Sequence, residues 1–167
     1  MSMGKVGGGG DGEWKVLLVD DEKQALEMYG AILREEGFPV LLAADARETR
    51  AVIHSEERLG LVVLDLRLPD VDGLDLFRWV RKKVPAVPVV ILTGYGSVET
   101  AVQALREGAY HYLTKPAEEE QWLSLVRTAL RRKELEEENS SLRRELRSAG
   151  GEGDLLARTV LMAPLRR

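Results

Sequence analysis

The stretch Leu61-Val62-Val63-Leu64-Asp65 joins a short apolar run to a carboxylate, and the same arrangement recurs along the chain. The other apolar runs and the polar residues that follow them are Val16-Leu17-Leu18-Val19 before Asp20-Asp21, Pro88-Val89-Val90-Ile91-Leu92 before Thr93, and Tyr110-His111-Tyr112-Leu113-Thr114 before Lys115. Such runs, followed by turn residues, are typical of buried parallel strands. In an open α/β sheet the ligand lies outside the carboxyl ends of the strands. We therefore expect these polar side chains to meet at one edge of a sheet.

Helix signals alternate with the strand signals. The expected elements are a strand over 15–19, a helix over 22–36, a strand over 38–43, a helix over 46–57, a strand over 61–64, a helix over 73–83, a strand over 88–92, a helix over 98–107, a strand over 110–113, and a helix from 117 or 118 to 148. Gly37 and Gly108 mark helix ends, while Asp45 and Ser97 mark helix starts. These β–α units predict an α/β fold with a doubly wound parallel sheet and helices on both faces.

Composition narrows the function. The chain has 167 residues, a formal net charge of −4 and no cysteine. It therefore offers no general basic surface for nucleic acid and no disulfide or thiolate metal site, which fits a reducing cytoplasm. No apolar stretch is long enough to span a bilayer. The expected organisation is a disordered glycine-rich lead over 1–13, one domain over 14–133, a linker helix over 134–148 and a flexible tail over 149–167.

The polar residues at the strand ends suit a divalent cation and a transferable phosphoryl group. One of the adjacent Asp20 and Asp21 can cap the next helix, but a second carboxylate adds repulsion that a hard cation such as Mg²⁺ removes. Asp65 is then a candidate nucleophile, because a carboxylate can form an acyl phosphate. The Thr93 hydroxyl can donate to a phosphoryl oxygen. Pro116 restricts the backbone of Lys115 to extended conformations, which directs the ammonium toward Asp65.

Taken in order, these motifs closely resemble the receiver domain of two-component response regulators, over about residues 14–133. The matching strings are Val-Asp-Asp (19–21), Leu-Asp-Leu-Arg-Leu-Pro-Asp-Val-Asp-Gly (64–73), Leu-Thr-Gly-Tyr-Gly (92–96) and Tyr-Leu-Thr-Lys-Pro (112–116). The resemblance implies a flavodoxin-like (βα)5 fold with strand order 2-1-3-4-5 and a long C-terminal helix. It also implies a cytoplasmic phosphoacceptor domain rather than an enzyme, with at most self-dephosphorylation.

The resemblance further implies a role for each site residue. Asp65 would accept the phosphoryl group from a sensor histidine kinase, and Thr93 and Lys115 would contact that group. The Mg²⁺ ligands would be Asp20, Asp21, Asp65 and the backbone carbonyl of Arg67. Tyr112 would be the aromatic switch that turns inward when Thr93 moves, although packing against a helix, on a strand face shared with Tyr110, is an alternative. Arg67 and Tyr95 match positions that modulate dephosphorylation.

The last helix carries two stripes. The stripe expected to pack on the sheet is Trp122, Val126, Ala129 and Leu130. A second stripe repeats by sevens, with Leu125, Arg132, Asn139 and Leu146 at a, and Thr128, Leu135 and Leu142 at d. Asn at a with Leu at d selects a parallel two-stranded coil, and the residues of the pairs Arg131–Glu136′ and Glu138–Arg143′ are opposite in charge, as such a coil needs. We expect a weak homodimer through Leu135, Asn139, Leu142 and Leu146 with the adjacent receiver face, a solvated charged helix being the alternative.

The run Tyr-Gly-Ser-Val-Glu-Thr-Ala-Val (95–102) and the linker Leu-Glu-Glu-Glu-Asn (135–139) resemble the NtrC-like branch. Its members place a receiver and a coiled linker before an AAA+ ATPase and a DNA-binding domain. After Arg147 there is no G-x-x-x-x-G-K-[ST] and too little chain for either domain. We therefore expect a truncated regulator, an isolated receiver or a single-domain receiver with a tail. Control of transcription would then be indirect, with no direct binding to nucleic acid or membrane.

Three other interpretations remain open. A haloacid-dehalogenase-like phosphatase also uses an Asp nucleophile with Mg²⁺, but it needs an acidic residue where Arg67 stands. An interaction module that only dimerises would not need the set of Asp65, Thr93 and Lys115. The segment Asp70-Val71-Asp72-Gly73 lacks the spacing of a Ca²⁺ loop and is expected to form a turn and a helix cap.

Overall fold

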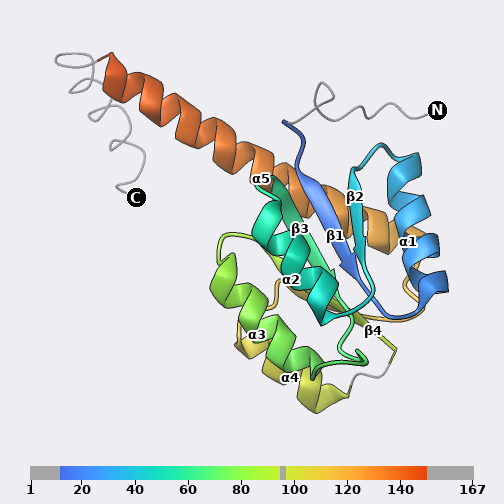
Figure 1. The fold of residues 1–167 in the computed structure, drawn as a ribbon. Coiled ribbons are helices and arrows are strands. Elements are labelled where there is room, and N and C mark those ends of the chain that lie inside the picture. The colour runs from blue at the N-terminus through green and yellow to red at the C-terminus, as the bar shows by residue number, and fades with distance from the viewer. Residues whose placement is uncertain (1–11, 95–96, 150–167) are drawn as a thin grey trace. The chain divides into compact units, whose positions relative to one another are not determined.

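The computed structural model describes residues 12–94 and 97–149, in which strands and helices alternate (Figure 1). The elements are β1 Lys15–Val19, α1 Lys23–Glu35, β2 Val40–Ala43, α2 Ala46–Ser55, β3 Leu59–Leu64, α3 Gly73–Lys83, β4 Val89–Thr93, α4 Val98–Arg106, β5 His111–Thr114 and α5 Glu119–Ser148. The strands form one parallel sheet in the order β2-β1-β3-β4-β5. The predicted doubly wound α/β fold, its strand order and its long last helix are confirmed.

An apolar core lies on each face of the sheet. Residues of α1 and α5, among them Leu33 and Trp122, form the core of one face. Residues of α2, α3 and α4, among them Ile53 and Phe77, form the core of the other. Successive residues of each inner strand serve opposite cores, which is why these strands are continuous apolar runs rather than alternating ones.

Local capping explains why most helix starts match the prediction. The Asp45 carboxylate accepts a hydrogen bond from the Glu48 N–H, and Ser97 forms a reciprocal capping box with Thr100. Gly37 and Gly108 have φ values of 86° and 103°, the left-handed conformation that ends a helix at low cost for glycine. These signals are local in sequence and therefore readable without the fold.

Two strand starts differ from the prediction by two residues, and those of β4 and β5 differ by one. β2 begins at Val40 rather than Phe38, because the Phe38 N–H donates to the Leu33 carbonyl and the ring is buried at the end of α1. β3 begins at Leu59 rather than Leu61, because Leu59 already pairs with Lys15. The register shifts after Lys15, an irregularity typical of a strand that contains a glycine, here Gly60.

The chain divides into two compact units, Met1–Leu130 and Arg131–Arg167, and α5 contributes to both. The predicted lead and tail lie almost entirely outside the described residues, so these boundaries stay predictions. Among the helices that the structure describes, none is both long and apolar enough to cross a membrane.

Candidate functional site

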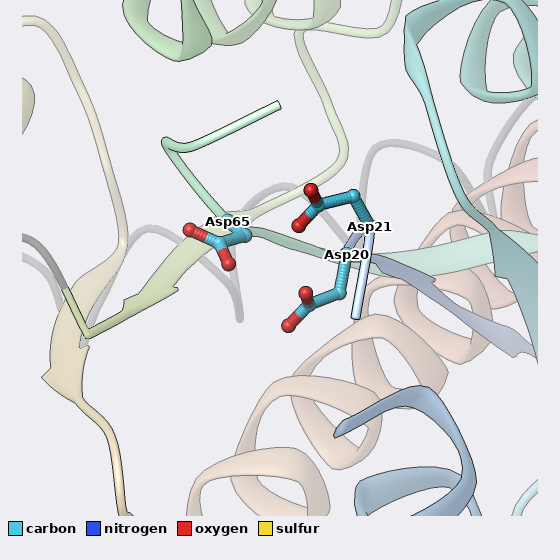
Figure 2. A group of neighbouring side chains, drawn as sticks. All are labelled: Asp20, Asp21 and Asp65. Atoms are coloured by element: carbon cyan, nitrogen blue, oxygen red, sulfur yellow. The ribbon is translucent and has the colours of Figure 1, made fainter. Parts of the chain in front are cut away.

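Three carboxylates meet at the carboxyl edge of the sheet (Figure 2). Asp20 and Asp21 follow β1 and Asp65 follows β3, and the Asp65 N–H donates to the Val19 carbonyl at 2.9 Å. One carboxylate oxygen from each of the three lies within 4.8 Å of the other two. Asp20 and Asp65 are buried, whereas Asp21 is exposed. Strand pairing alone thus brings together residues that are far apart in sequence.

Lys115 supplies the positive charge of this cluster. Its Nζ donates to Asp20 and, at 2.9 Å, to Oδ2 of Asp65. The backbone holds it there, since the Lys115 N–H donates to the Thr93 carbonyl at 3.0 Å. The Lys115–Pro116 peptide bond is cis. Thr93 ends β4, the strand between β3 and β5, and is fully buried. The structure therefore gathers the predicted Asp20, Asp21, Asp65, Thr93 and Lys115 at one edge.

The electrostatics of the cluster favour an added cation. Burial raises the pKa of Asp20, and the ammonium of Lys115 offsets this only in part. For Lys115 burial acts in the opposite direction, but hydrogen bonds to Asp20 and Asp65 outweigh it and raise the pKa of the ammonium. One ammonium thus faces three carboxylates. Mg²⁺ prefers oxygen ligands, and the carboxylates of this cluster outnumber its positive charge, so the residues present fit that ion.

The alternative that one Asp of the pair caps the following helix is wrong. The N-cap of α1 is Glu22, and it makes no side-chain capping bond. Asp20 instead accepts from the Glu22 N–H at 2.9 Å through Oδ1, which fixes the orientation of its carboxylate toward the cluster.

A tight loop after Asp65 holds its carboxylate from the other side. Oδ1 of Asp65 accepts from the Arg67 N–H at 3.0 Å. The backbone of Arg67 also pairs with that of Asp72 in an isolated antiparallel β-bridge. Asp72 caps α3, so the expected turn and helix cap over 70–73 are confirmed. A Cβ on Gly73 would lie 2.1 Å from the Leu66 carbonyl oxygen, so only glycine fits there.

Asp70 is a contributor that the sequence analysis did not assign to the site. Its Oδ1 accepts from the Ala46 N–H at 3.1 Å and thereby ties the loop after Asp65 to the start of α2. The only sequence signal for it is an acidic residue in a turn, which many surface loops share.

The predicted face of Tyr112 needs a correction. Tyr110 packs against the α1–α5 core, whereas Tyr112 packs against the α2–α4 core. The two rings diverge because β5 begins only at His111, so Tyr110 lies outside the regular strand. Packing of Tyr112 against helices is therefore confirmed, while its role as a switch stays a prediction. Tyr95 lies outside the described residues.

The stripes of α5 differ in exposure. The residues of the stripe predicted to pack on the sheet are all buried, namely Trp122, Val126, Ala129 and Leu130. In the second stripe Leu125 is half-buried against the α1–α5 core and so does not belong to an exposed seam, whereas the other leucines are exposed, at 48% for Leu135, 54% for Leu142 and 40% for Leu146. Arg131 and Arg132 pair with Glu134 and Glu136 of the same helix. The seam and the solvated helix both fit these contacts, so the dimer stays a prediction.

Comparison with known proteins agrees with this geometry. Residues 16–127 match the model of the response regulator receiver domain. The chain is 35% identical over 152 residues to the C4-dicarboxylate transport transcriptional regulatory protein DctD of Rhizobium meliloti, a match over 91% of this chain and 33% of that protein. It is 38% identical over 126 residues to the response regulator protein PilR of Pseudomonas aeruginosa, over 75% of this chain and 28% of PilR. The chain thus spans about a third of these relatives or less.

Solved structures point the same way. The receiver domain of NtrX from Brucella abortus is 36% identical, with a TM-score of 0.65 over 70% of this chain and 98% of that one. A CheY-like receiver domain protein from Methanospirillum hungatei is 34% identical, with a TM-score of 0.70 over 74% of this chain and 98% of that one. With relatives such as DctD, NtrX and PilR, this chain belongs to the response regulator receiver domain family, in its NtrC-like branch.

Proposed function

We propose that Asp65 accepts a phosphoryl group from a sensor histidine kinase in a Mg²⁺-dependent reaction. The observation that carries this proposal is the position of the Asp65 carboxylate, which is buried, within 4.8 Å of two further carboxylates and 2.9 Å from the Lys115 ammonium. A carboxylate is a weak nucleophile, so its orientation matters. The Arg67 N–H fixes Oδ1, and the Lys115 ammonium orients Oδ2, the oxygen that would attack.

In this reaction a carboxylate oxygen of Asp65 forms a bond to phosphorus as the bond between phosphorus and the imidazole nitrogen breaks. The Lys115 ammonium stays close to the new acyl phosphate and balances its charge, and the Thr93 hydroxyl donates to a phosphoryl oxygen. Asp20, Asp21, Asp65 and the carbonyl of Arg67 would hold Mg²⁺. When bound, the ion neutralises charge on the phosphoryl oxygens.

The output of the switch is the surface formed by α4, β5 and the first part of α5. Only Ala104 of α4 is buried, while Val98, Val102 and Leu105 are exposed, so few apolar contacts hold this helix in place. A helix anchored so lightly needs little free energy to move when the charge near Thr93 changes. Phosphorylation would shift the populations of two states and alter self-association along α5. The transcriptional output, as the relatives' names suggest, would be exerted through other domains or partners.

The test is intact mass spectrometry after incubation with acetyl phosphate and Mg²⁺. A single phosphoryl adduct is expected on the wild-type protein, absent from Asp65→Asn and absent when Mg²⁺ is chelated. Asp75→Asn, on the exposed face of α3, is the matched control and should label normally. Rapid release of inorganic phosphate without an adduct would favour a phosphatase, and neither adduct nor release would favour a module that only binds partners.

A further inference from the structure

A cluster of cationic groups surrounds Trp79 on the face of α2 and α3. The guanidinium carbon of Arg50 lies 5.5 Å from the centroid of the Trp79 ring, and Nζ of Lys83 lies 5.9 Å from it. The rings of His54 and Trp79 pack edge to face, with their centroids 5.7 Å apart. These four residues, Arg50, His54, Trp79 and Lys83, are called the Trp79 patch here. Two of them come from α2 and two from α3, so only the fold brings them together.

The charges of the Trp79 patch have no counter-ions within the part of the chain that the structure describes. Neither Arg50 nor Lys83 forms an ion pair there, in contrast to Arg78, which pairs with Asp75 and Glu107. Arg47 and Lys82, both exposed, add further positive charge on the same two helices. The chain as a whole carries a net charge of −4, so this face is opposite in sign to the protein around it.

The carboxylates of α2 and α3 do not neutralise the patch, because they are engaged elsewhere. Oε1 of Glu48 accepts from the Ala44 N–H at the start of α2, and Asp75 pairs with Arg78. Attraction between a cation and the face of an indole is strongest for tryptophan and offsets part of the repulsion between like charges. Arg50 and Lys83 thus both lie within 5.9 Å of the Trp79 ring centroid and form no ion pair within the described part of the chain, an arrangement that an anionic ligand would complete.

We propose that the Trp79 patch docks an acidic segment of a partner protein, whose carboxylates reach Arg50 and Lys83 while an apolar side chain covers the Trp79 indole. Tryptophan and arginine are the residues most enriched at the energetic centres of protein interfaces. A peptide fits better than a nucleic acid, because the negative chain would repel a long polyanion beyond the few cations of the patch. The surface is separate from the site of Asp65, so the inference goes beyond the proposed function.

The test follows the three indole N–H signals in a ¹⁵N-correlation spectrum during titration with a synthetic twelve-residue peptide of Glu-Glu-Leu repeats. Trp122 is fully buried and serves as an internal control. The Trp79 signal is expected to move saturably while that of Trp122 stays in place, and a peptide with Gln in place of Glu should bind at least about tenfold more weakly. No movement of the Trp79 signal at millimolar peptide would overturn the proposal.

Charge reversals separate docking from general attraction. Arg50→Glu with Lys83→Glu should weaken peptide binding at least about tenfold. The matched control Arg34→Glu with Arg106→Glu changes the net charge equally on other helices and should leave affinity within about twofold. The milder Arg50→Gln, with a smaller expected loss, covers the case in which the double reversal unfolds the protein. Equal losses in both pairs, or tighter binding of duplex DNA than of the peptide, would overturn the proposal.

Discussion

Lys115 and Asp65 follow strands that are not neighbours in the sheet, yet Nζ of Lys115 donates to Oδ2 of Asp65 at 2.9 Å. The lysine side chain spans the end of β4 to reach the carboxylate, and it also contacts Asp20. One ammonium therefore holds two buried carboxylates that would otherwise repel each other. The single positive charge of Lys115 does not balance the negative charges of the cluster, and the pKa of Asp20 is raised as a result of its burial. A substitution that removes the charge of Asp20 therefore tests the electrostatics of the cluster directly.

Asp20→Asn is expected to stabilise the protein at neutral pH when Mg²⁺ is chelated. Because the folded state raises the pKa of Asp20, this group favours folding below its unfolded pKa, and that contribution is lost as pH rises through the folded pKa. The amide keeps the acceptor for the Glu22 N–H but carries no charge. The gain should be on the order of 1 kcal/mol in urea unfolding, with a flatter dependence on pH between mildly acidic and neutral conditions.

The same variant should bind Mg²⁺ more weakly, so its stability should respond less to added Mg²⁺ than that of the wild-type protein. Arg34→Gln, on the exposed surface of α1, serves as the control for a single charge change. If Asp20→Asn proved less stable than the wild type without Mg²⁺, the pairing with Lys115 would outweigh burial.

Gly73→Ala is expected to damage both the fold and phosphorylation. The added Cβ would lie 2.1 Å from the carbonyl oxygen and 2.3 Å from Cα of Leu66, so the backbone next to Asp65 must shift. Unfolding in urea should show a loss of roughly 1–3 kcal/mol, and labelling by acetyl phosphate should slow. Gly30→Ala is the matched control, because its nearest contact would be an ordinary 3.6 Å to Leu42. Equal stability of the two variants would contradict the steric argument.

The ion pair between Arg78 and Glu107 is expected to restrain α4. Arg78 donates through Nε and Nη2 to both oxygens of Glu107, at 2.7 and 3.1 Å, and this hydrogen bonding lowers the pKa of Glu107. The restraint is therefore present above the unfolded pKa of Glu107 and weakens as pH falls through its folded pKa. Glu107→Gln should speed amide hydrogen exchange in α4 at neutral pH, while α1 stays unchanged. Equal exchange rates in α4 of both proteins would show that this pair does not restrain the helix.

The extent to which sequence predicted the structure depends on the range of each interaction. The caps Asp45 and Ser97 act within one helical turn, and the sequence located them correctly. The convergence of Asp20 and Asp65 followed from the rule for parallel strands, which needs only the order of elements. The start of β2 was missed because the N–H of Phe38, a good strand former, bonds to the Leu33 carbonyl at the end of α1 instead. The start of β3 was missed because Leu59 pairs with Lys15, a partner that is distant along the chain.

Other features were beyond the sequence because their partners are distant along the chain. The contact of Asp70 with the start of α2 links residues 24 positions apart. The steric need for glycine at 73 depends on the path of the loop, which no local pattern encodes. The Trp79 patch likewise combines two helices whose side chains face each other only after the sheet has formed.

Tyr112→Phe is expected to raise stability in the unphosphorylated state. The Tyr112 hydroxyl is buried and has no hydrogen-bond partner among the described residues, which is costly. Removing it should increase the free energy of unfolding by about 1 kcal/mol. Tyr29→Phe is the contrasting control, since its hydroxyl accepts from the Ala117 N–H at 3.1 Å and its loss should destabilise. A destabilised Tyr112→Phe would mean that the hydroxyl is hydrogen-bonded in solution.

Leu135→Lys with Leu142→Lys is expected to weaken self-association, because both side chains are exposed and occupy the d positions of the heptad pattern. Sedimentation equilibrium should show the dissociation constant rising at least about tenfold, before and after treatment with acetyl phosphate. Ser140→Lys with Ser141→Lys adds the same charge on the same helix at positions outside the seam, and should leave association within about twofold. If both pairs reduced association equally, charge alone would explain the effect. If neither did, any dimer would use another surface, and the coiled-coil interpretation of residues 134–148 would fail.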